Sequence, residues 1–200
     1  MSAASRVEEA DLDRVRELAS IGAGHAANAL ARLTGRTCEM QVPTVRLQEA
    51  GGPAEASPAG ASERGMAGVL FEVEGGPGGV LALLFPSATC ERLLAQLLGG
   101  DGRERHSPAA RSALCEVGNI LASHAANAVG KTLGVTMLPS VPLLALDDPR
   151  AALADLLARR EPERPALRIE SEICDRAREL CGIFVFVPDT LSRIAPAAPF

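Results

Sequence analysis

The sequence predicts a mixed α/β (α+β) fold built from two halves that are related by an approximate twofold axis and share one sheet. The first observation is a gap-free internal repeat, in which residues 17–43 match residues 116–142 at a constant offset of 99 positions. The second is a long amphipathic helix pattern at the start of each copy. The third is the likeness between LALLFP, ending at Pro86, and IFVFVP, ending at Pro188. Two copies are too few for a solenoid, so we expect two halves around one core.

Each copy is expected to follow the same order of elements. Ser107 is a suitable N-cap and Pro108 a suitable first residue for the second long helix. Gly35 and Gly134 are expected to end the two long helices. The expected elements are long helices over 10–34 and 108–133, strands over 37–47 and 136–146, hairpins over 66–85 and 166–187, and short helices over 87–98 and 149–160.

The composition predicts a single domain over residues 1–200, with repeat halves at about 10–98 and 107–194 and a low-complexity loop at 49–65. Hydrophobic residues form 47% of the chain, which is enough for one sizeable core. With five Phe and no Trp or Tyr, the chain offers no stacking platform for single-stranded nucleic acid. The net charge is −5 and the basic residues are scattered, so we expect no nucleic-acid partner.

The N-terminal segment is acidic and lacks the apolar region of a secretory signal. No apolar run is long enough to span a bilayer, so we expect no membrane insertion. Five cysteines stand singly, without a CxxC pair or a histidine at zinc-ligand spacing: Cys38, Cys90, Cys115, Cys174 and Cys181. We therefore expect a cytoplasmic protein with no metal site, whose cysteines are small core residues in a reducing compartment.

The glycine-rich stretch GGPGG at Gly75–Gly79 allows two interpretations. A phosphate-binding loop would need a following helix and a closing Lys-Ser/Thr pair, and both are missing. Strand patterns flank the stretch on both sides, so we expect a hairpin turn.

A stripe of short polar side chains runs along each long helix. On the second helix, the stripe covers a sector of about 80° and consists of Ser112, Glu116, Asn119, Ser123 and Asn127. Its counterpart on the first helix consists of Asp13, Glu17, Ser20, Gly24 and Asn28. One interpretation is an ordinary solvated helix face. However, Asn is a poor helix former and the long Lys, Arg and Gln side chains are missing from the stripe, which favours close approach of another protein.

Two histidines, His25 and His124, recur at the same place in both copies. They lie toward the apolar side of the helices, so we expect them to pack in the interior rather than to act in catalysis.

The pattern Ser112-x3-Glu116-x2-Asn119, which continues as GNILASHAANAVGKTLG, resembles the CheC family of chemotaxis phosphatases and its relatives CheX and FliY. The likeness covers essentially the whole chain, including the twofold repeat. It implies a CheC-like fold and hydrolysis of the aspartyl phosphate on a CheY-type response regulator.

The resemblance also implies roles for single residues. Asn119 would position the attacking water, and Glu116 would pair with a cation of the receiver. Ser112 and Ser123 would be accessory positions of the docking face. No cofactor of its own is expected, because the receiver supplies the magnesium.

In the first copy, the corresponding pattern is Asp13-x3-Glu17-x2-Ser20, in which a serine replaces the asparagine. The resemblance therefore implies one competent site and one degenerate site. The alternative is a binding module without turnover, which would regulate a CheD-type receptor deamidase or serve in the flagellar switch. The absence of an additional assembly domain in the sequence argues against the switch version.

Overall fold

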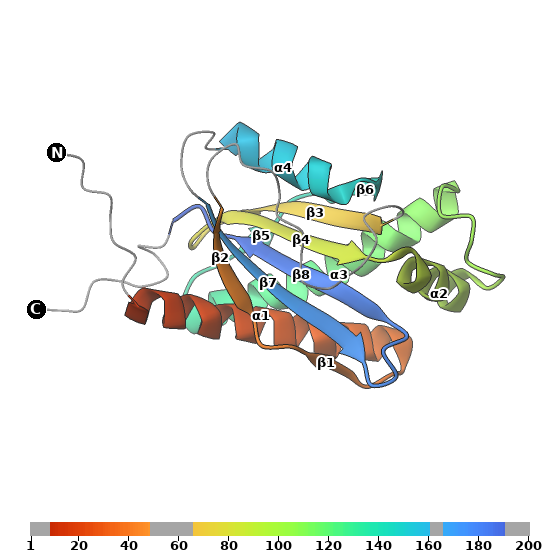
Figure 1. Ribbon diagram of the computed structural model, residues 1–200, viewed down its shortest axis with the longest axis horizontal. Helices are drawn as coiled ribbons and strands as arrows, with labels where there is room; N and C mark the ends of the chain where they lie inside the picture. The colour runs from red at the N-terminus through yellow and green to blue at the C-terminus, as the bar shows by residue number, and fades with distance from the viewer. Residues whose placement is uncertain (1–8, 49–65, 161–165, 191–200) are drawn as a thin grey trace, which may run out of the picture.

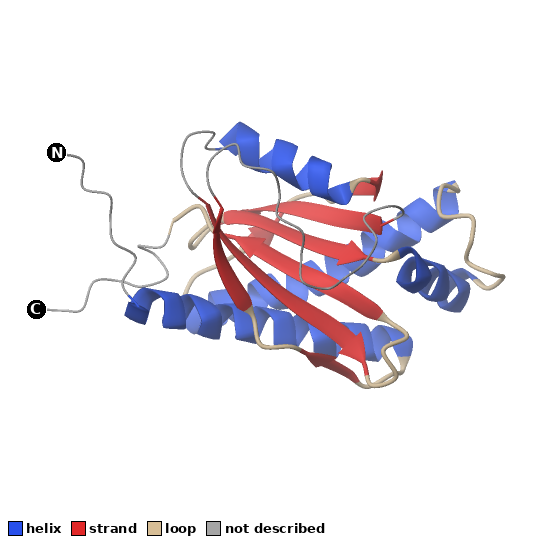
Figure 2. Ribbon diagram, in the orientation of Figure 1, coloured by secondary structure: helices blue, strands red, loops and turns tan. Residues whose placement is uncertain are grey.

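The computed structural model describes residues 9–48, 66–160 and 166–190 as an antiparallel sheet with helices on both faces (Figures 1 and 2). The helices are α1 (Glu9–Thr34), α2 (Ser87–Leu98), α3 (Pro108–Leu133) and α4 (Pro149–Arg160). The strands are β1 (Cys38–Met40), β2 (Thr44–Gln48), β3 (Met66–Glu74), β4 (Gly79–Phe85), β5 (Leu138–Pro139), β6 (Leu143–Asp147), β7 (Ala166–Asp175) and β8 (Cys181–Val187). The loop predicted over 49–65 lies outside the described residues, and the single domain over 1–200 stays a prediction.

The strand order is symmetric about the centre of the sheet. Strands β8 and β4 pair at the centre of the sheet, with β7 beside β8 and β3 beside β4. At one edge, the short strands β1 and β2 both pair with β7. At the other edge, β5 and β6 both pair with β3. The central pair consists of the two similar segments that end at Pro86 and Pro188, and it joins Leu81 to Phe186. Because β1 and β2 of the first copy pair with β7 of the second, the halves interlock. The predicted sharing of one sheet by the two copies is confirmed.

Each edge differs from the prediction, because the strands expected over 37–47 and 136–146 are broken in two. Proline follows an outward-pointing valine at each break, and it has no backbone N–H for the ladder. Val42 and Val141 are 83% and 87% exposed.

The breaks repeat in both copies. Gln41 N–H donates to the Glu172 carbonyl at 2.8 Å, and Ser140 N–H donates to the Glu72 carbonyl at 2.7 Å. Gln41 and Ser140, which occupy corresponding positions of the sequence repeat, thus make equivalent hydrogen bonds.

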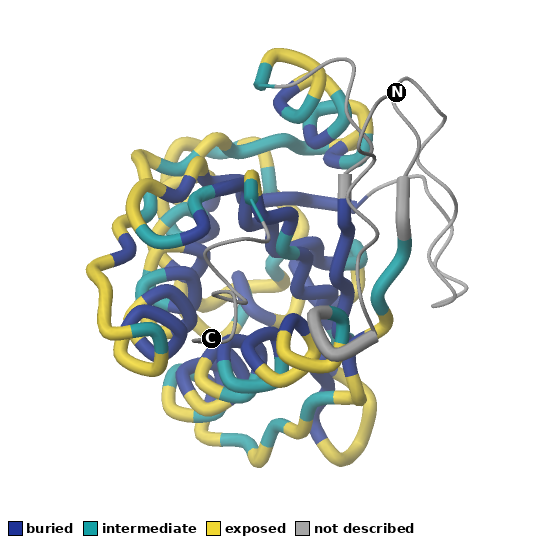
Figure 3. Tube along the Cα trace, turned by 90° about the vertical axis from the view of Figure 1, so that its left-hand side faces the viewer, coloured by how far each residue is buried: buried dark blue, intermediate teal, exposed yellow. Residues whose placement is uncertain are grey.

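Two apolar layers hold the helices on the sheet. The larger lies between the sheet and the helix pair α1–α3, and it includes Phe71, Phe85 and Leu121. The smaller lies between the opposite face and α4, and it includes Leu84 and Leu153. Figure 3 shows these buried segments enclosed by exposed loops and helix faces. Within the described ranges, no helix has the length and apolar composition that a membrane crossing requires.

The GGPGG stretch forms the turn of the β3–β4 hairpin, as predicted. Gly78 N–H donates to the Gly75 carbonyl at 2.9 Å. Gly75 has a φ of 83°, and a Cβ built there would lie 2.1 Å from the Thr136 carbonyl oxygen. Only glycine fits this turn against the chain that follows α3.

The cysteine prediction is wrong for two of the five residues. Cys174 and Cys181 form a disulfide across the β7–β8 hairpin, where they lie directly opposite each other. Cys90 is buried as expected, whereas Cys38 and Cys115 are half-buried free thiols. This pairing depends on the strand register, which cysteine spacing alone does not give.

Candidate active site on α3

Both ends of α3 are fixed by local interactions, and they set which side chains face outward. Ser107 caps the N-terminus by accepting a hydrogen bond from the Ala110 N–H at 3.2 Å, and Pro108 occupies the first turn. Gly134 ends the helix in the left-handed conformation, with φ 69°, and its N–H donates to the carbonyls of the last turn. The predicted bounds of 108–133 are confirmed.

The polar stripe of α3 faces away from the sheet. Ser112, Glu116, Asn119 and Asn127 are exposed, and Ser123 is half-buried. On the opposite side of the helix, the residues that pack into the larger core include Leu114, Val117 and Leu121. The helix therefore presents a carboxylate and an amide one turn apart on its outer surface.

Glu116 and Asn119 have no side-chain hydrogen bond or ion pair to any part of the chain that the structure describes. This matters because a side chain already bonded within the protein would have to break that bond before it could bind a partner. Both groups are instead available to water or to another molecule.

The stripe on α1 is different in this respect. The Ser20 hydroxyl donates to the Arg16 carbonyl of its own helix at 2.8 Å. Asp13 forms an ion pair with Arg16 at 2.8 Å. Glu17 remains exposed and has no partner among the described residues. Ser20 therefore lacks the amide and also uses its hydroxyl internally.

The two stripes lie toward opposite ends of the helix pair. Helices α1 and α3 run antiparallel on one face of the sheet (Figure 1). They meet closely near Gly22, where a built Cβ would lie 3.2 Å from Val129 Cγ2 and 3.8 Å from Ala125 Cβ. From the helical rise, Glu17 and Glu116 are roughly 20 Å apart along the pair. They belong to two separate surfaces.

Arg111 and Cys115 lie near Glu116 and Asn119 on α3. Arg111 is exposed beside Ser112, about two turns before Asn119. Burial raises the pKa of the neighbouring Cys115 thiol, which makes this group a poor thiolate nucleophile at neutral pH. The Glu116 carboxylate and the Asn119 amide remain as exposed groups that can hydrogen-bond to a water molecule.

The packing role expected for the two histidines is wrong, since His25 and His124 are both exposed. They lie at the border between the apolar and polar sides of their helices. Ala26 and Ala125, one residue further on, take the buried positions instead.

The fold and the site together define a twofold repeat protein that offers an exposed glutamate and asparagine from one surface helix. The model of the CheC-like family matches residues 12–46 and 110–144, which are the α1–β2 and α3–β6 segments of the two copies. The chain belongs to the CheC-like family.

Two relatives support this assignment. The CheY-P phosphatase CheC of Bacillus subtilis is 29% identical over 198 residues, covering 94% of this chain and 93% of the relative. The CheC1 protein of Halobacterium salinarum is 30% identical over 135 residues, covering 66% of this chain and 67% of the relative.

Two solved structures share the fold. FliY of Thermotoga maritima superposes with a TM-score of 0.70 at 21% identity, covering 94% of this chain and 96% of that structure. The CheX protein of Borrelia burgdorferi, solved in complex with CheY, BeF3 and magnesium, superposes with a TM-score of 0.56 at 11% identity, covering 85% and 96%.

Proposed function

We propose that this chain is a phosphatase that hydrolyses the aspartyl phosphate of a CheY-type response regulator, and that α3 holds its competent site. The observation that carries the proposal is the contrast between the helices. Glu116 and Asn119 on α3 are exposed and have no partner among the residues that the structure describes, whereas the Ser20 hydroxyl on α1 donates to the Arg16 carbonyl of its own helix. The relative from Bacillus subtilis is named for this activity, and the Borrelia burgdorferi relative was solved with CheY bound.

Hydrolysis of an aspartyl phosphate requires few groups from the phosphatase. An acyl phosphate is already activated, and the receiver contributes its own magnesium, lysine and acidic residues, so this chain needs no cofactor of its own. What remains is to hold a water in line with phosphorus, which removes most of the entropic part of the barrier. The Asn119 amide can donate to and accept from that water, and it does not repel the phosphoryl oxygens as a carboxylate would.

Glu116 has a different task in this proposal. Its carboxylate pairs with a cation on the receiver and orients α3 over the phosphoryl group. Ser112 and Ser123, on the same face as Glu116 and Asn119, provide the flanks of the docking surface. The same proposal places the protein in the cytoplasm together with its receiver.

A second candidate function is binding without turnover. It is supported by α1, which keeps the exposed Glu17 but has lost the amide. In this version, the protein would hold a receiver or a CheD-type deamidase without accelerating hydrolysis.

The test is the decay of a phosphorylated receiver with and without this protein, together with a measurement of complex formation. The phosphatase proposal predicts decay that accelerates in proportion to protein concentration. Unchanged decay in the presence of a detectable complex would reject it in favour of the binding module.

A further inference from the structure

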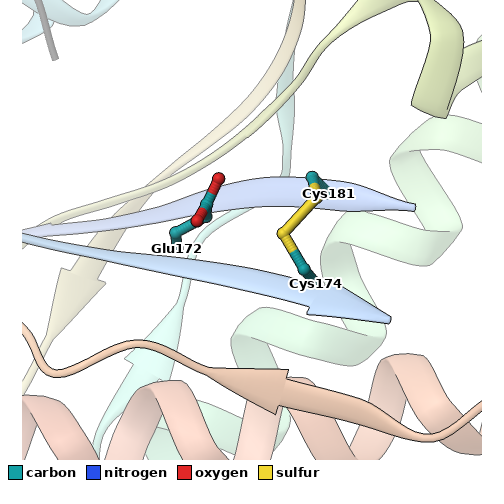
Figure 4. A group of neighbouring side chains, drawn as sticks. All are labelled: Glu172, Cys174 and Cys181. Atoms are coloured by element: carbon teal, nitrogen blue, oxygen red, sulfur yellow. A yellow bond between two sulfur atoms is a disulfide. The ribbon is translucent and has the colours of Figure 1, made fainter. Parts of the chain in front are cut away.

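Three potential metal-ligating side chains lie together on the face of the sheet opposite to α3. They are Glu172, Cys174 and Cys181, and their two sulfur atoms and one carboxylate oxygen all lie within 4.8 Å of one another (Figure 4). Cys174 and Cys181 are directly opposite on β7 and β8, and Glu172 is two residues earlier on β7, on the same face. From the sequence we predicted no metal site, because the chain has no CxxC pair and no histidine at zinc-ligand spacing.

We propose that these three residues bind a zinc ion when the Cys174–Cys181 disulfide is reduced. Two thiolates and a carboxylate are donors that zinc accepts, and three protein ligands leave a fourth tetrahedral position for water. Zinc–sulfur bonds of about 2.3 Å place the two sulfurs about 3.8 Å apart. The Cα atoms are 4.2 Å apart, so a change of side-chain rotamer is enough to open this space.

The partner of Glu172 supports this site. Arg178 donates to both oxygens of Glu172, at 2.8 and 3.0 Å, and so fixes the direction of the carboxylate. Two thiolates and one carboxylate exceed the charge of a zinc ion by one negative unit, and the guanidinium balances it. An ion can also enter, because Glu172 and Cys181 are only half-buried.

The disulfide form is converted to the zinc form in two steps. A cellular dithiol reduces the Cys174–Cys181 bond to two thiols and is itself oxidised to a disulfide, so two electrons and two protons pass to the protein. Zinc then displaces both thiol protons to solvent and binds the thiolates. In a reducing compartment, the dithiol form is favoured and the zinc site becomes available.

Disulfide and zinc would be alternative cross-links at one end of the β7–β8 hairpin. This end is also joined to α2, because Thr89 Oγ1 accepts from the Cys181 N–H at 3.0 Å and donates to the Cys181 carbonyl at 2.8 Å. Zinc therefore keeps this hairpin end closed when the disulfide is absent.

The experiment is a cobalt titration of the full chain after reduction with a phosphine, which does not itself compete as a thiol ligand. We expect one cobalt ion per chain, with thiolate-to-cobalt charge transfer and tetrahedral d–d absorption, and loss of both when zinc is added. Cys181→Ser should abolish the charge-transfer band. Glu172→Gln should keep a band but weaken affinity on the order of tenfold or more.

The matched control is Cys38→Ser, because this free thiol packs on the α1–α3 face of the sheet. It should titrate like the wild type, and the unreduced protein should bind no cobalt. A second readout needs no variant: zinc should protect Cys174 and Cys181 from alkylation and leave the rate of Cys115 alkylation unchanged. Equal titration of Cys181→Ser and wild type, or equal alkylation with and without zinc, would overturn the proposal.

Discussion

Gly118 of α3 lies directly on Val69 of β3. A Cβ built on Gly118 would come within 2.5 Å of Val69 Cγ1 and 2.7 Å of Val69 Cβ, which no side-chain rotation can relieve. Gly118 stands between Glu116 and Asn119 in the sequence but on the buried side of the helix. The close contact of Gly118 with Val69 thus also fixes how far Glu116 and Asn119 lie from the sheet and in which direction their side chains point.

We therefore expect Gly118→Ala to destabilise the fold by about 1–3 kcal/mol through overpacking. For a protein of this size, each kcal/mol of lost stability lowers the Tm by roughly 2–4 °C. The matched control is Gly24→Ala on α1, where the built Cβ meets only Met40 Sδ at 3.7 Å. There we expect a gain of about 0.5–1 kcal/mol, because alanine favours the helix. Equal Tm values for Gly118→Ala and wild type would show that the close packing on Val69 is unimportant.

Glu116→Ala should weaken receiver binding on the order of tenfold and reduce kcat less, because the carboxylate orients the complex and does not touch the water. The control is Asp155→Ala, an exposed acidic residue on α4 at the other face of the sheet. Separate measurements of KM and kcat for receiver dephosphorylation distinguish the two effects. A fall in kcat alone would contradict the docking role.

The first helix offers a gain-of-function prediction. Ser20→Asn, placed in an Asn119→Ala background, should restore measurable dephosphorylation, because it supplies an amide at the corresponding height of α1. In the wild-type background, the same change should at most double the rate.

Asp13→Ser should be combined with Ser20→Asn, because Asp13 adds a negative charge one turn from Glu17, worth on the order of 1 kcal/mol at the surface. A triple variant that binds receiver at α1 but remains inert would show that these motif residues alone do not define the site.

The hairpin end at Asp175 predicts a pH dependence of stability. Burial would raise the pKa of the Asp175 carboxyl, but hydrogen bonds from the Leu180 N–H, the Arg36 guanidinium and the Glu179 N–H outweigh it and lower the pKa. A folded-state pKa below the unfolded value of about 3.9 stabilises the protein above that pH, and this contribution is lost as pH falls through the folded pKa.

Asp175→Asn should therefore lower Tm at neutral pH, by roughly 5 °C, and by less in acid. Thermal unfolding measured from neutral pH down to about pH 2 checks this. A difference in Tm that is constant across the range would contradict the assigned titration.

The long helices could be predicted from the sequence because periodicity, caps and terminal glycines are local signals. The outward direction of Glu116 and Asn119 followed from the same periodicity. Two features depend on tertiary packing and could not be predicted: the Cys174–Cys181 pairing, which needs the β7–β8 register, and the contact of Gly118 with Val69. The hydrogen bond of Ser20 to the Arg16 carbonyl is local, but it depends on the side-chain rotamer, which the sequence does not give. The prediction that the two histidines are buried was wrong, because a residue at the border between the apolar and polar sides of a helix can be either buried or exposed.

The most direct test of the proposed site is the rate of receiver dephosphorylation by Asn119→Ala, measured beside Asn127→Ala. Both asparagines are exposed on the same face of α3, two turns apart, so the pair separates the loss of a water-positioning amide from the general loss of a polar surface residue. We predict that Asn119→Ala keeps its Tm and its receiver affinity but loses activity on the order of 100-fold or more, whereas Asn127→Ala turns over at close to the wild-type rate. Wild-type turnover by the purified, folded Asn119→Ala protein would contradict the assignment of the active site to α3.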